Sequence, residues 1–465
     1  MSRRHFTLLA LGAALALGAC GSLVPATQAP SADLRAGFRV DAGDPPLSNA
    51  NIAHEWDGFF ADERLRRVVG LALTGNRSLR AGLAAVERAR AQYGVTEAAR
   101  WPDLRGSASA SRQGGGASTN SSSSYSVSLG LASWEIDLFD RLGSLEGAAL
   151  ARYLVQQETQ SGARLSLVAS VAEAWLNLAA ERQREQLALA LRDSQQRTLG
   201  LTERQYALGA VSGLQMARAQ TAFEAARGEV ARTAAAVVQA RLALELLAGQ
   251  PLPESLLPTA QVQQATALPD VPAGLPATVL LQRPDLRSAE QTLQAAAYDV
   301  GAARAARFPR ITLTANAGTR SAALGDLFRP GTGFWSLLPS IDLPIFDAGA
   351  RQSQVDANEA TRRQALAQYE SALQSAFREV ADALAVRDSL AERLLAQQAQ
   401  VDAAERSLSL SEQSYRLGAL SQLELLDAQR QLAAAQQGQV TLRQTEQANR
   451  VLLLRALGGR WSAGG

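Results

Sequence analysis

The hydrophobic and polar positions change their period several times along the chain. Residues 6–17 form a continuous apolar run that follows Arg3 and Arg4. Polar or small residues alternate with apolar ones at 126–131 and 311–316, which is the period of a strand. Elsewhere apolar and small residues recur at steps of three and four, as in packed helices. The pattern therefore predicts an N-terminal apolar segment, short strands and long helices.

The helical pattern is clearest at about 350–417, and a similar stretch without proline covers about 144–208. At 1.5 Å per residue, ~65 helical residues extend roughly 100 Å, which is longer than an ordinary domain. Two positions of the seam are polar, Arg387 and Gln397, and we expect them to tune register or meet solvent. The full seam is Leu373, Ala376, Val380, Ala383, Arg387, Leu390, Leu394, Gln397 and Val401.

Both long helices are predicted to end in the same turn. Gly209 and Gly418 stand where a helix takes a left-handed C′ glycine. Three residues later, Ser212 and Ser421 can cap a new helix, each with Gln or Glu at the N3 position of a capping box. Each long helix thus turns back as an antiparallel helical hairpin, with return helices to about 248 and 457.

These similarities belong to a tandem duplication of the whole chain. Residues 206–214 (YALGAVSGL) match 415–423 (YRLGALSQL) at an offset of 209. Residues 98–102 (AARWP) match 305–309 (AARFP) at an offset of 207. The Phe-Asp steps at 139–140 and 346–347 keep this second offset. Several matches at nearly one offset indicate two copies of one structural unit.

Each copy is predicted to contain a helix, a β-hairpin and a long helical hairpin. The first copy covers 61–249, with the β-hairpin at about 103–138 and the helical hairpin at about 144–249. The second covers 277–459, with the corresponding parts at about 309–346 and 350–457. A proline-rich connector at 250–276 joins the copies, and 460–465 form a C-terminal tail.

The leading helices, at about 61–100 and 284–307, end at a Trp-Pro or Phe-Pro step, because proline disfavours helix in the residue before it. Strand character follows at 107–111, 126–131, 311–316 and 341–345. Glycine-rich and serine-rich composition predicts loops at 114–124 and 325–333. Aromatic residues within or beside these strands fit either an aromatic girdle at a bilayer interface or the core of a small sheet; they are Tyr125, Trp134, Phe334 and Trp335.

Four strands in one chain are too few to close a barrel, since the smallest membrane barrels need about eight. Two chains would supply eight strands and three would supply twelve. We therefore expect the chain to oligomerise.

The composition excludes much chemistry. The chain has no lysine, so all 46 basic residues are arginine, and no P-loop lysine or Schiff base is available. The only histidines are His5 and His54, and the only cysteine is Cys20. A metal site or a Cys-His pair has almost nothing to build from, so we expect no enzyme, no cofactor and no metal.

The N-terminus is predicted to be an export signal, with residues 1–19 as the signal peptide. Its apolar run ends in Leu-Gly-Ala before Cys20, which is similar to a bacterial lipobox, and Cys20 is then the lipidated first residue of the mature chain. The alternative is an ordinary signal peptide with an incidental cysteine. Residues 20–60 are expected to form a tether. Removal of two arginines changes the formal charge from +2 to 0, so nothing indicates nucleic-acid binding.

The chain resembles the outer membrane factors of the TolC/OprM type, especially the lipoprotein branch that works with resistance-nodulation-division (RND) efflux pumps. The resemblance spans nearly the whole mature chain. The motifs that carry it are Trp134-Glu-Ile-Asp-Leu-Phe139, Arg283-Pro-Asp-Leu-Arg287, Ala303-Arg-Ala-Ala-Arg-Phe-Pro309, Pro344-Ile-Phe-Asp347, Tyr415-Arg-Leu-Gly418, Leu425-Leu-Asp-Ala-Gln429 and Leu457-Gly-Gly-Arg-Trp461.

The resemblance implies a mainly α-helical homotrimer with a twelve-stranded β-barrel in the outer membrane and an α-helical barrel in the periplasm. It also implies that the helical tips meet a periplasmic adaptor (membrane fusion) protein that couples the channel to an inner-membrane RND transporter. The tip residues are Leu208, Gly209, Ala210, Val211, Ser212, Leu417, Gly418, Ala419, Leu420 and Ser421. These turns carry no acidic residue, although family members often have acids at the constriction.

The function that this resemblance implies is passive conduction of small molecules out of the cell by a lipid-anchored outer-membrane channel. Two alternatives are a lipid-anchored periplasmic coiled-coil scaffold that does not conduct, and an outer-membrane duct for type I protein secretion. The strand pair in each copy favours a channel, because a scaffold does not need it.

Overall fold

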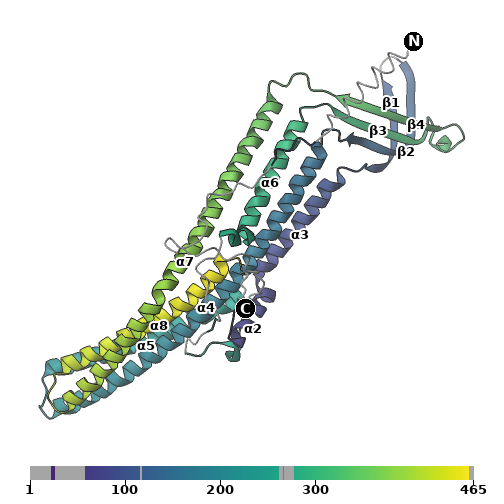
Figure 1. The fold of residues 1–465 in the computed structure, drawn as a ribbon. Coiled ribbons are helices and arrows are strands. Elements are labelled where there is room, and N and C mark those ends of the chain that lie inside the picture. The colour runs from purple at the N-terminus through teal and green to yellow at the C-terminus, as the bar shows by residue number, and fades with distance from the viewer. Residues whose placement is uncertain (1–21, 27–57, 116–117, 261–264, 267–276, 460–465) are drawn as a thin grey trace. The chain divides into compact units, whose positions relative to one another are not determined.

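The structure is a computed structural model, which describes residues 22–26, 58–115, 118–260, 265–266 and 277–459. Most of the described chain is helical, with one antiparallel sheet (Figure 1). The elements are α2 (Glu63–Gly75), α3 (Arg77–Ala98), β1 (Leu104–Gly115), β2 (Ser118–Ile136), α4 (Arg141–Ala207), α5 (Gly213–Ala248), η2 (Glu254–Leu256), η3 (Ala277–Gln282), α6 (Pro284–Ala305), β3 (Arg310–Ser321), η4 (Leu324–Asp326), β4 (Gly333–Asp342), α7 (Ala350–Arg416) and α8 (Gln422–Ala456).

The predicted duplication is visible in the element order. Each copy contains a leading helical segment, which is α2 and α3 in the first copy and α6 in the second, followed by two strands and two antiparallel long helices. α4 and α7 both have 67 residues. The return helices α5 and α8 have 36 and 35 residues. The expected order of elements is therefore confirmed except for the leading helix of the first copy, and the ends of the long helices lie within a few residues of their predicted positions.

The chain divides into two compact units. The first unit consists of residues 1–31, 84–158 and 287–371. The second consists of residues 32–83, 159–286 and 372–465. The first unit holds the four-stranded sheet in the order β1-β2-β3-β4, with every neighbouring pair antiparallel. The two hairpins are thus joined through β2 and β3, and β1 and β4 form the sheet edges.

The sheet corrects two predictions about the strands. β2 begins at Ser118, so most of the segment expected to be a loop at 114–124 is strand. Its serines continue the ladder opposite β1, with Ser122 paired to Gln113 and Ser124 to Ser111, so pairing overrides composition. In the second copy, β4 ends at Asp342, and the strand expected at 341–345 lies earlier along the chain.

The helical part of the first unit packs through small residues. Leu293 and Ala296 of α6 form a buried cluster with Ala365 of α7. A Cβ atom added at Gly147 of α4 would lie 2.7 Å from the ring of Tyr298 on α6. Close approach of this kind needs glycine or alanine at the contact, which fits the many small residues in the sequence.

The second unit has the larger hydrophobic core. Trp175 of α4, Leu244 of α5 and Val451 of α8 are buried together with Val68 of α2. The connector also lies against α4, because the Trp175 Nε1–H donates to the Leu256 carbonyl at 3.3 Å. The predicted seam of α7 is largely buried, including Leu373, Ala376, Val380, Ala383, Leu390 and Val401.

The expected single helix at about 61–100 is wrong, because the chain forms α2 and α3 with a break at Asn76. Asn76 adopts an extended conformation, and its side chain accepts a hydrogen bond from Leu79 N at 3.0 Å. Its Nδ2 donates to the Leu247 carbonyl at 3.0 Å, and a Cβ at the adjacent Gly75 would lie 2.6 Å from the Ala248 carbonyl oxygen. Contacts with α5 therefore fix the break.

Candidate functional site

The four-stranded sheet has one apolar face and one polar face. Side chains alternate between faces along a strand, and directly paired residues share a face. The registers place on one face Leu104, Gly106, Ala108, Ala110, Tyr125, Val127, Leu129, Leu131, Ile311, Leu313, Ala315, Ala317, Thr319, Trp335, Leu337, Pro339 and Ile341. Polar residues join this face only toward the β1–β2 turn and the end of β3, where they are Arg112, Ser123 and Ser321. The opposite face carries Arg105, Ser107, Ser109, Ser126, Ser128, Gly130, Thr312, Thr314, Asn316, Gly318, Arg320, Phe334, Ser336, Leu338, Ser340 and Asp342.

The polar face is held together by hydrogen bonds between strands. The hydroxyl oxygens of Ser107 and Ser128 lie 2.9 Å apart, and those of Ser109 and Ser126 lie 2.8 Å apart. Phe334 is an aromatic residue on this polar face. The Arg320 guanidinium lies 4.8 Å from its ring centroid. Of the four aromatic residues expected in a girdle, Phe334 alone faces the polar side.

A β-bulge keeps this division intact at the end of β2. Leu131 pairs with Ala315 and Trp134 with Leu313, so three steps on β2 oppose two on β3. Ser133 within the bulge has φ +46°. Without this extra residue, Trp134 and Ile136 would turn to the polar face, because a one-residue slip reverses every side chain. The bulge therefore extends the apolar face to the end of the strand.

The apolar face is exposed in the single chain. Trp335 is 80%, Ile341 69% and Leu104 64% accessible. Contiguous apolar surface of this size indicates a partner or a membrane, because soluble monomers rarely leave large apolar patches uncovered.

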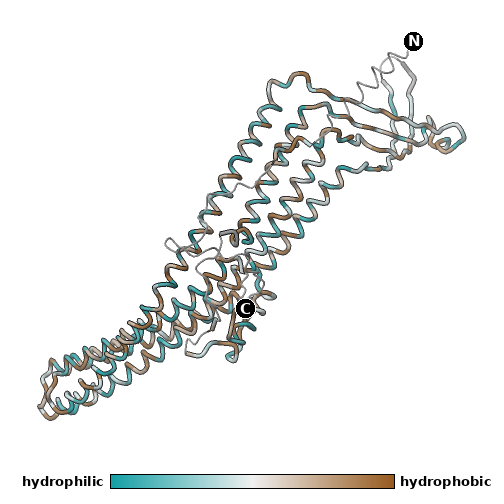
Figure 2. The backbone as a smooth tube through the Cα atoms, in the orientation of Figure 1, coloured by the Kyte–Doolittle hydropathy of each residue, from teal (hydrophilic) through white to brown (hydrophobic). Residues whose placement is uncertain are grey.

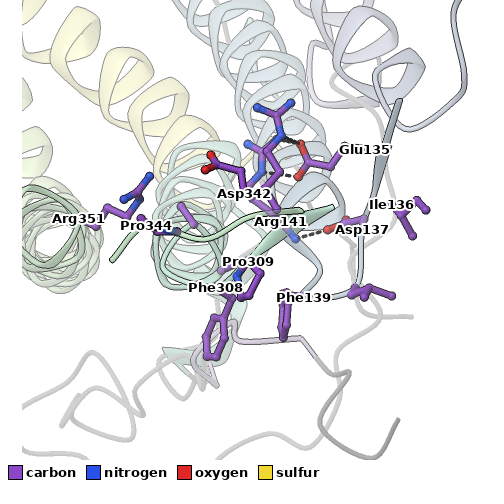
Figure 3. Close-up of a pocket in the computed structure, with 14 residues that line it drawn as sticks. Glu135, Ile136, Asp137, Phe139, Arg141, Phe308, Pro309, Asp342, Pro344 and Arg351 are labelled. Carbon is purple, nitrogen blue, oxygen red and sulfur yellow. Dashed lines mark hydrogen bonds and ion pairs between the residues drawn. The ribbon is translucent and has the colours of Figure 1, made fainter. Parts of the chain in front are cut away.

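The junction between the strands and the helices lines an open pocket of about 220 Å³ (Figure 3). Glu135, 8% exposed, accepts hydrogen bonds from Arg141 Nε and Nη2 at 2.8 and 2.7 Å. Arg310 of β3 lies 2.7 Å from the same carboxylate. The hydrogen bond with Glu135 raises the pKa of Arg141 above its usual value. The cluster ties β2, β3 and α4 together at one point.

The start of α4 is capped by Asp137. Its carboxylate accepts hydrogen bonds from Arg141 N at 2.7 Å and Gly143 N at 2.9 Å. In the second copy Asp347 accepts from Gly349 N at 3.0 Å and Arg351 N at 3.2 Å. The Arg351 backbone hydrogen bond and nearby charges lower the pKa of Asp347. An aspartate shortly before each long helix thus accepts hydrogen bonds from backbone N–H groups that have no partner within the helix.

The predicted turns at the helical tips are present in both copies. Gly209 and Gly418 have φ of +71° and +73°, and each donates its N–H to the carbonyl of the tyrosine three residues earlier at 3.0 Å. Ser212 and Ser421 form complete capping boxes with Gln215 and Glu424. The ten predicted tip residues are exposed except for Val211 and Leu420, which are half-buried.

Apolar side chains at the tips are unusually open to solvent. Leu208 is 83% and Leu417 85% exposed. The two hairpins are linked close to these turns, because the Tyr415 hydroxyl donates to Gln205 Oε1 at 3.4 Å.

A buried polar seam between α4 and α8 was missed by sequence reasoning. Gln422 Nε2 donates to Thr202 Oγ1 at 3.0 Å, and Gln429 Nε2 donates to Ser194 Oγ at 3.1 Å. Gln195 Nε2 donates to Gln429 Oε1 at 3.0 Å. The signal was available as a seven-residue spacing between the glutamines and a four-residue spacing between Thr198 and Thr202.

Cys20 lies outside the described residues, but the segment that follows it is in place. The Leu23 carbonyl accepts a hydrogen bond from Arg304 Nη1 of α6 at 3.3 Å. Val24 lies against Gly301, where an added Cβ would approach its Cγ2 to 2.6 Å. Residues 22–26 are therefore fixed on α6.

Hydrophobic and hydrophilic positions are interspersed along the long helices (Figure 2). Among the described residues, no helix is both long enough and apolar enough to span a bilayer. The same part of the chain holds no cluster of three or more His, Cys, Asp or Glu side chains that could bind a metal ion.

Comparison with known proteins places these features in a family. The family of the outer membrane efflux protein matches residues 68–250 and 275–459, two segments that overlap the two copies of the duplicated unit. The cation efflux system protein CusC of Escherichia coli O6:H1 is 37% identical over 460 residues, covering 98% of each chain. The outer membrane protein OprJ of Pseudomonas aeruginosa is 37% identical over 470 residues, covering 100% of this chain and 98% of OprJ.

A solved structure is similar over the same length. The open state of the MtrE outer membrane channel of Neisseria gonorrhoeae matches with a TM-score of 0.86 and 36% identity. The match covers 94% of this chain and 98% of that chain.

Proposed function

Because the chain belongs to the outer membrane efflux protein family, we propose that it is the outer-membrane channel of a tripartite efflux system. The observation that carries the proposal is the two-faced sheet, with its exposed apolar face and its serine-rich polar face. Such alternation is the pattern of a membrane barrel strand, which turns apolar side chains to lipid and polar ones to a water-filled lumen.

The channel is a homotrimer. One chain supplies four strands and leaves β1 and β4 as edges. Unpaired edges in a membrane are costly, because no water satisfies their N–H and carbonyl groups. Three chains joined edge to edge give a closed sheet of twelve strands, and the two helical hairpins of each chain give twelve long helices around the same axis.

Transport through this duct is passive and involves no bond chemistry. The polar face offers hydroxyl and amide groups that can replace water around a passing solute, such as those of Ser126, Ser128 and Asn316. An inner-membrane RND transporter supplies the energy, and a periplasmic adaptor protein couples it to the channel. Small molecules are the exported class.

The adaptor binds at the helical tips. Leu208 and Leu417 are exposed at two turns with the same backbone conformation, so the trimer presents six similar apolar contact points. The hydrogen bond of Tyr415 to Gln205 joins the two hairpins of one chain, and opening of the tip would break it.

The mature chain is anchored in the outer membrane by lipid on Cys20. Support comes from the N-terminal signal pattern and from residues 22–26, which are held on α6 in the unit that contains the sheet. A single residue separates Cys20 from the docked segment in the sequence, and so short a connection would keep the lipid near that unit.

Cysteine accessibility on adjacent residues of β2 tests the proposal. Ser126→Cys, on the polar face, should react with a small charged thiol reagent in intact outer membranes, whereas Val127→Cys should be shielded by lipid. Native mass spectrometry of the detergent-solubilised protein should give three chains. Equal reactivity at both positions together with a monomeric mass would favour the scaffold that does not conduct.

A further inference from the structure

The contact between the two copies at the strand-to-helix junction contains a stacked aromatic pair. Phe139 follows β2, and Phe308 precedes β3. Their ring centroids are 4.6 Å apart with an interplanar angle of 18° (Figure 3). This pair lies at the end of the β2–β3 ladder. It is therefore part of the contact between the first and second copies within one chain.

Each ring has a counterpart at the opposite edge of the sheet. At the offset of 207, Trp101 corresponds to Phe308 and Phe346 to Phe139. The helix exits before Trp101 and Phe308 are the same, since each donates its N–H to the carbonyl three residues earlier at 3.0 Å. Trp101 precedes the edge strand β1, and Phe346 follows the edge strand β4.

These counterparts have no cover in the single chain. Phe346 is 88% exposed, its neighbour Ile345 is 92% exposed, and Trp101 is 72% exposed. Phe308, whose ring is stacked, is 43% exposed. Trp101 and Phe346 are therefore exposed at the positions where the equivalent residues of the other copy are stacked on each other.

We propose that Phe346, together with Ile345, packs on Trp101 of a second copy of this chain, and that this contact repeats the Phe139–Phe308 stack between subunits. The inference rests on the proposed trimer. In a chain built by tandem duplication, the contact that joins its two halves can also form between two chains. Here it would form where β4 of one chain meets β1 of the next chain. Aromatic side chains with large buried area are typical of such interface centres.

A two-residue difference between the copies does not remove the correspondence. Ala348 and Gly349, with φ of +53° and +86°, extend the second turn before α7. They follow Phe346, so its distance from β4 changes little: it lies four residues after Asp342, and Phe139 lies three residues after Ile136. The small shift is the reason that we include Ile345 in the contact.

The test uses paired cysteines. Trp101→Cys is combined with Phe346→Cys, and in a second variant with Ile345→Cys, and membranes are treated with a short bismaleimide. We expect at least one pair to give covalent dimers and trimers in denaturing gels, at a yield several-fold above either single cysteine. The Phe139→Cys/Phe308→Cys pair is the internal control and should link within one chain without a gain in mass.

Alanine variants give a second readout that does not need added thiols. Trp101→Ala and Phe346→Ala should each lower the temperature at which the trimer dissociates in detergent, and the double variant should lose little more than either single one. Phe328→Ala is the matched control, because Phe328 is 77% exposed in the β3–β4 loop. It should leave the dissociation temperature unchanged.

The outcomes separate this inference from the proposed function. A trimer by native mass whose cysteine pairs react no more than the single variants would overturn the aromatic contact and leave the channel proposal standing; these side chains would then face lipid. A protein that stays monomeric would overturn both. Additive losses in the double alanine variant would also contradict a direct contact.

Discussion

A charge placed on the apolar face of β2 should disrupt assembly far more than a charge placed on its polar face. Leu129, on the apolar face, is 54% exposed and is paired with Gly106 and Ala317, neither of which offers a hydrogen-bond acceptor side chain. Ser128, its neighbour, is on the polar face and shares a hydrogen bond with Ser107. The two positions differ by one residue in sequence and lie at nearly the same depth.

The expected magnitudes follow from these environments. An arginine on the lipid side of a barrel costs about 2–4 kcal/mol near the bilayer midplane. Ser128→Arg loses one serine hydrogen bond, worth about 1 kcal/mol, and its charge remains in water. The two variants thus differ by about 2 kcal/mol per chain, which changes a folding equilibrium roughly 30-fold. The difference applies to each of the three chains of the trimer.

The assay compares Leu129→Arg with Ser128→Arg at equal expression. The fraction of trimer in outer membranes, read on unheated denaturing gels, should fall strongly for Leu129→Arg and remain near wild type for Ser128→Arg. Leu129→Ala controls for loss of the side chain alone. Equal trimer yields from the two arginine variants, or a greater loss at Ser128, would refute the assignment of the faces.

Three further predictions concern the helical parts. Arg283, 7% exposed, donates to the Ala456 carbonyl and to the half-exposed carboxylates of Asp285 and Glu379. Arg283→Met should cost about 1–2 kcal/mol, because hydrogen bonds are lost but water can solvate the two carboxylates. Arg287→Met, where the arginine itself is half-exposed, should cost under about 1 kcal/mol, and both costs are measured by thermal unfolding at a fixed scan rate. Burial alone would raise the pKa of Asp285, but Arg283 lowers it, so this stabilisation should be present above the unfolded-state pKa of Asp285 and be lost as pH falls through its lower folded-state pKa; loss at rising pH would contradict it. Gly301→Val should displace residues 22–26 and speed their proteolysis, whereas Gly228→Ala, with nothing within 4 Å of its added Cβ, should not. Gly418→Val, forced to φ near +73°, should impair drug efflux and leave trimer assembly intact; normal drug tolerance would count against docking at the tips.

The sequence predicts most of the fold because the same local devices occur twice. The left-handed glycines and the capping boxes at the helical tips depend on residues within one turn, so they can be recognised without tertiary contacts. The length of α4 and α7 follows from the absence of proline. Alternation predicts four strands, but it misses two parts of them. Serine-rich composition at 118–124 hides a strand that its partner β1 stabilises, and β4 lies at Gly333–Asp342 and not at 341–345.

What the sequence does not predict depends on distant contacts. The break at Asn76 requires the Leu247 carbonyl, which lies 171 positions away along the chain. The hydrogen bond between Gln429 and Ser194 joins α8 to α4 across 235 positions of sequence. At the candidate site, alternation identifies the two faces, but only the register shows that the bulge at Ser133 keeps Trp134 on the apolar side.

Single-channel recording tests the central claim most directly. Purified protein with a verified trimeric mass is added to a planar lipid bilayer, and the current is recorded at fixed voltage and salt. We predict stepwise, long-lived ionic currents, altered by Ser128→Arg because its charge enters the polar lumen. A correctly folded trimer that inserts into the bilayer and carries no current under any applied voltage would contradict the account.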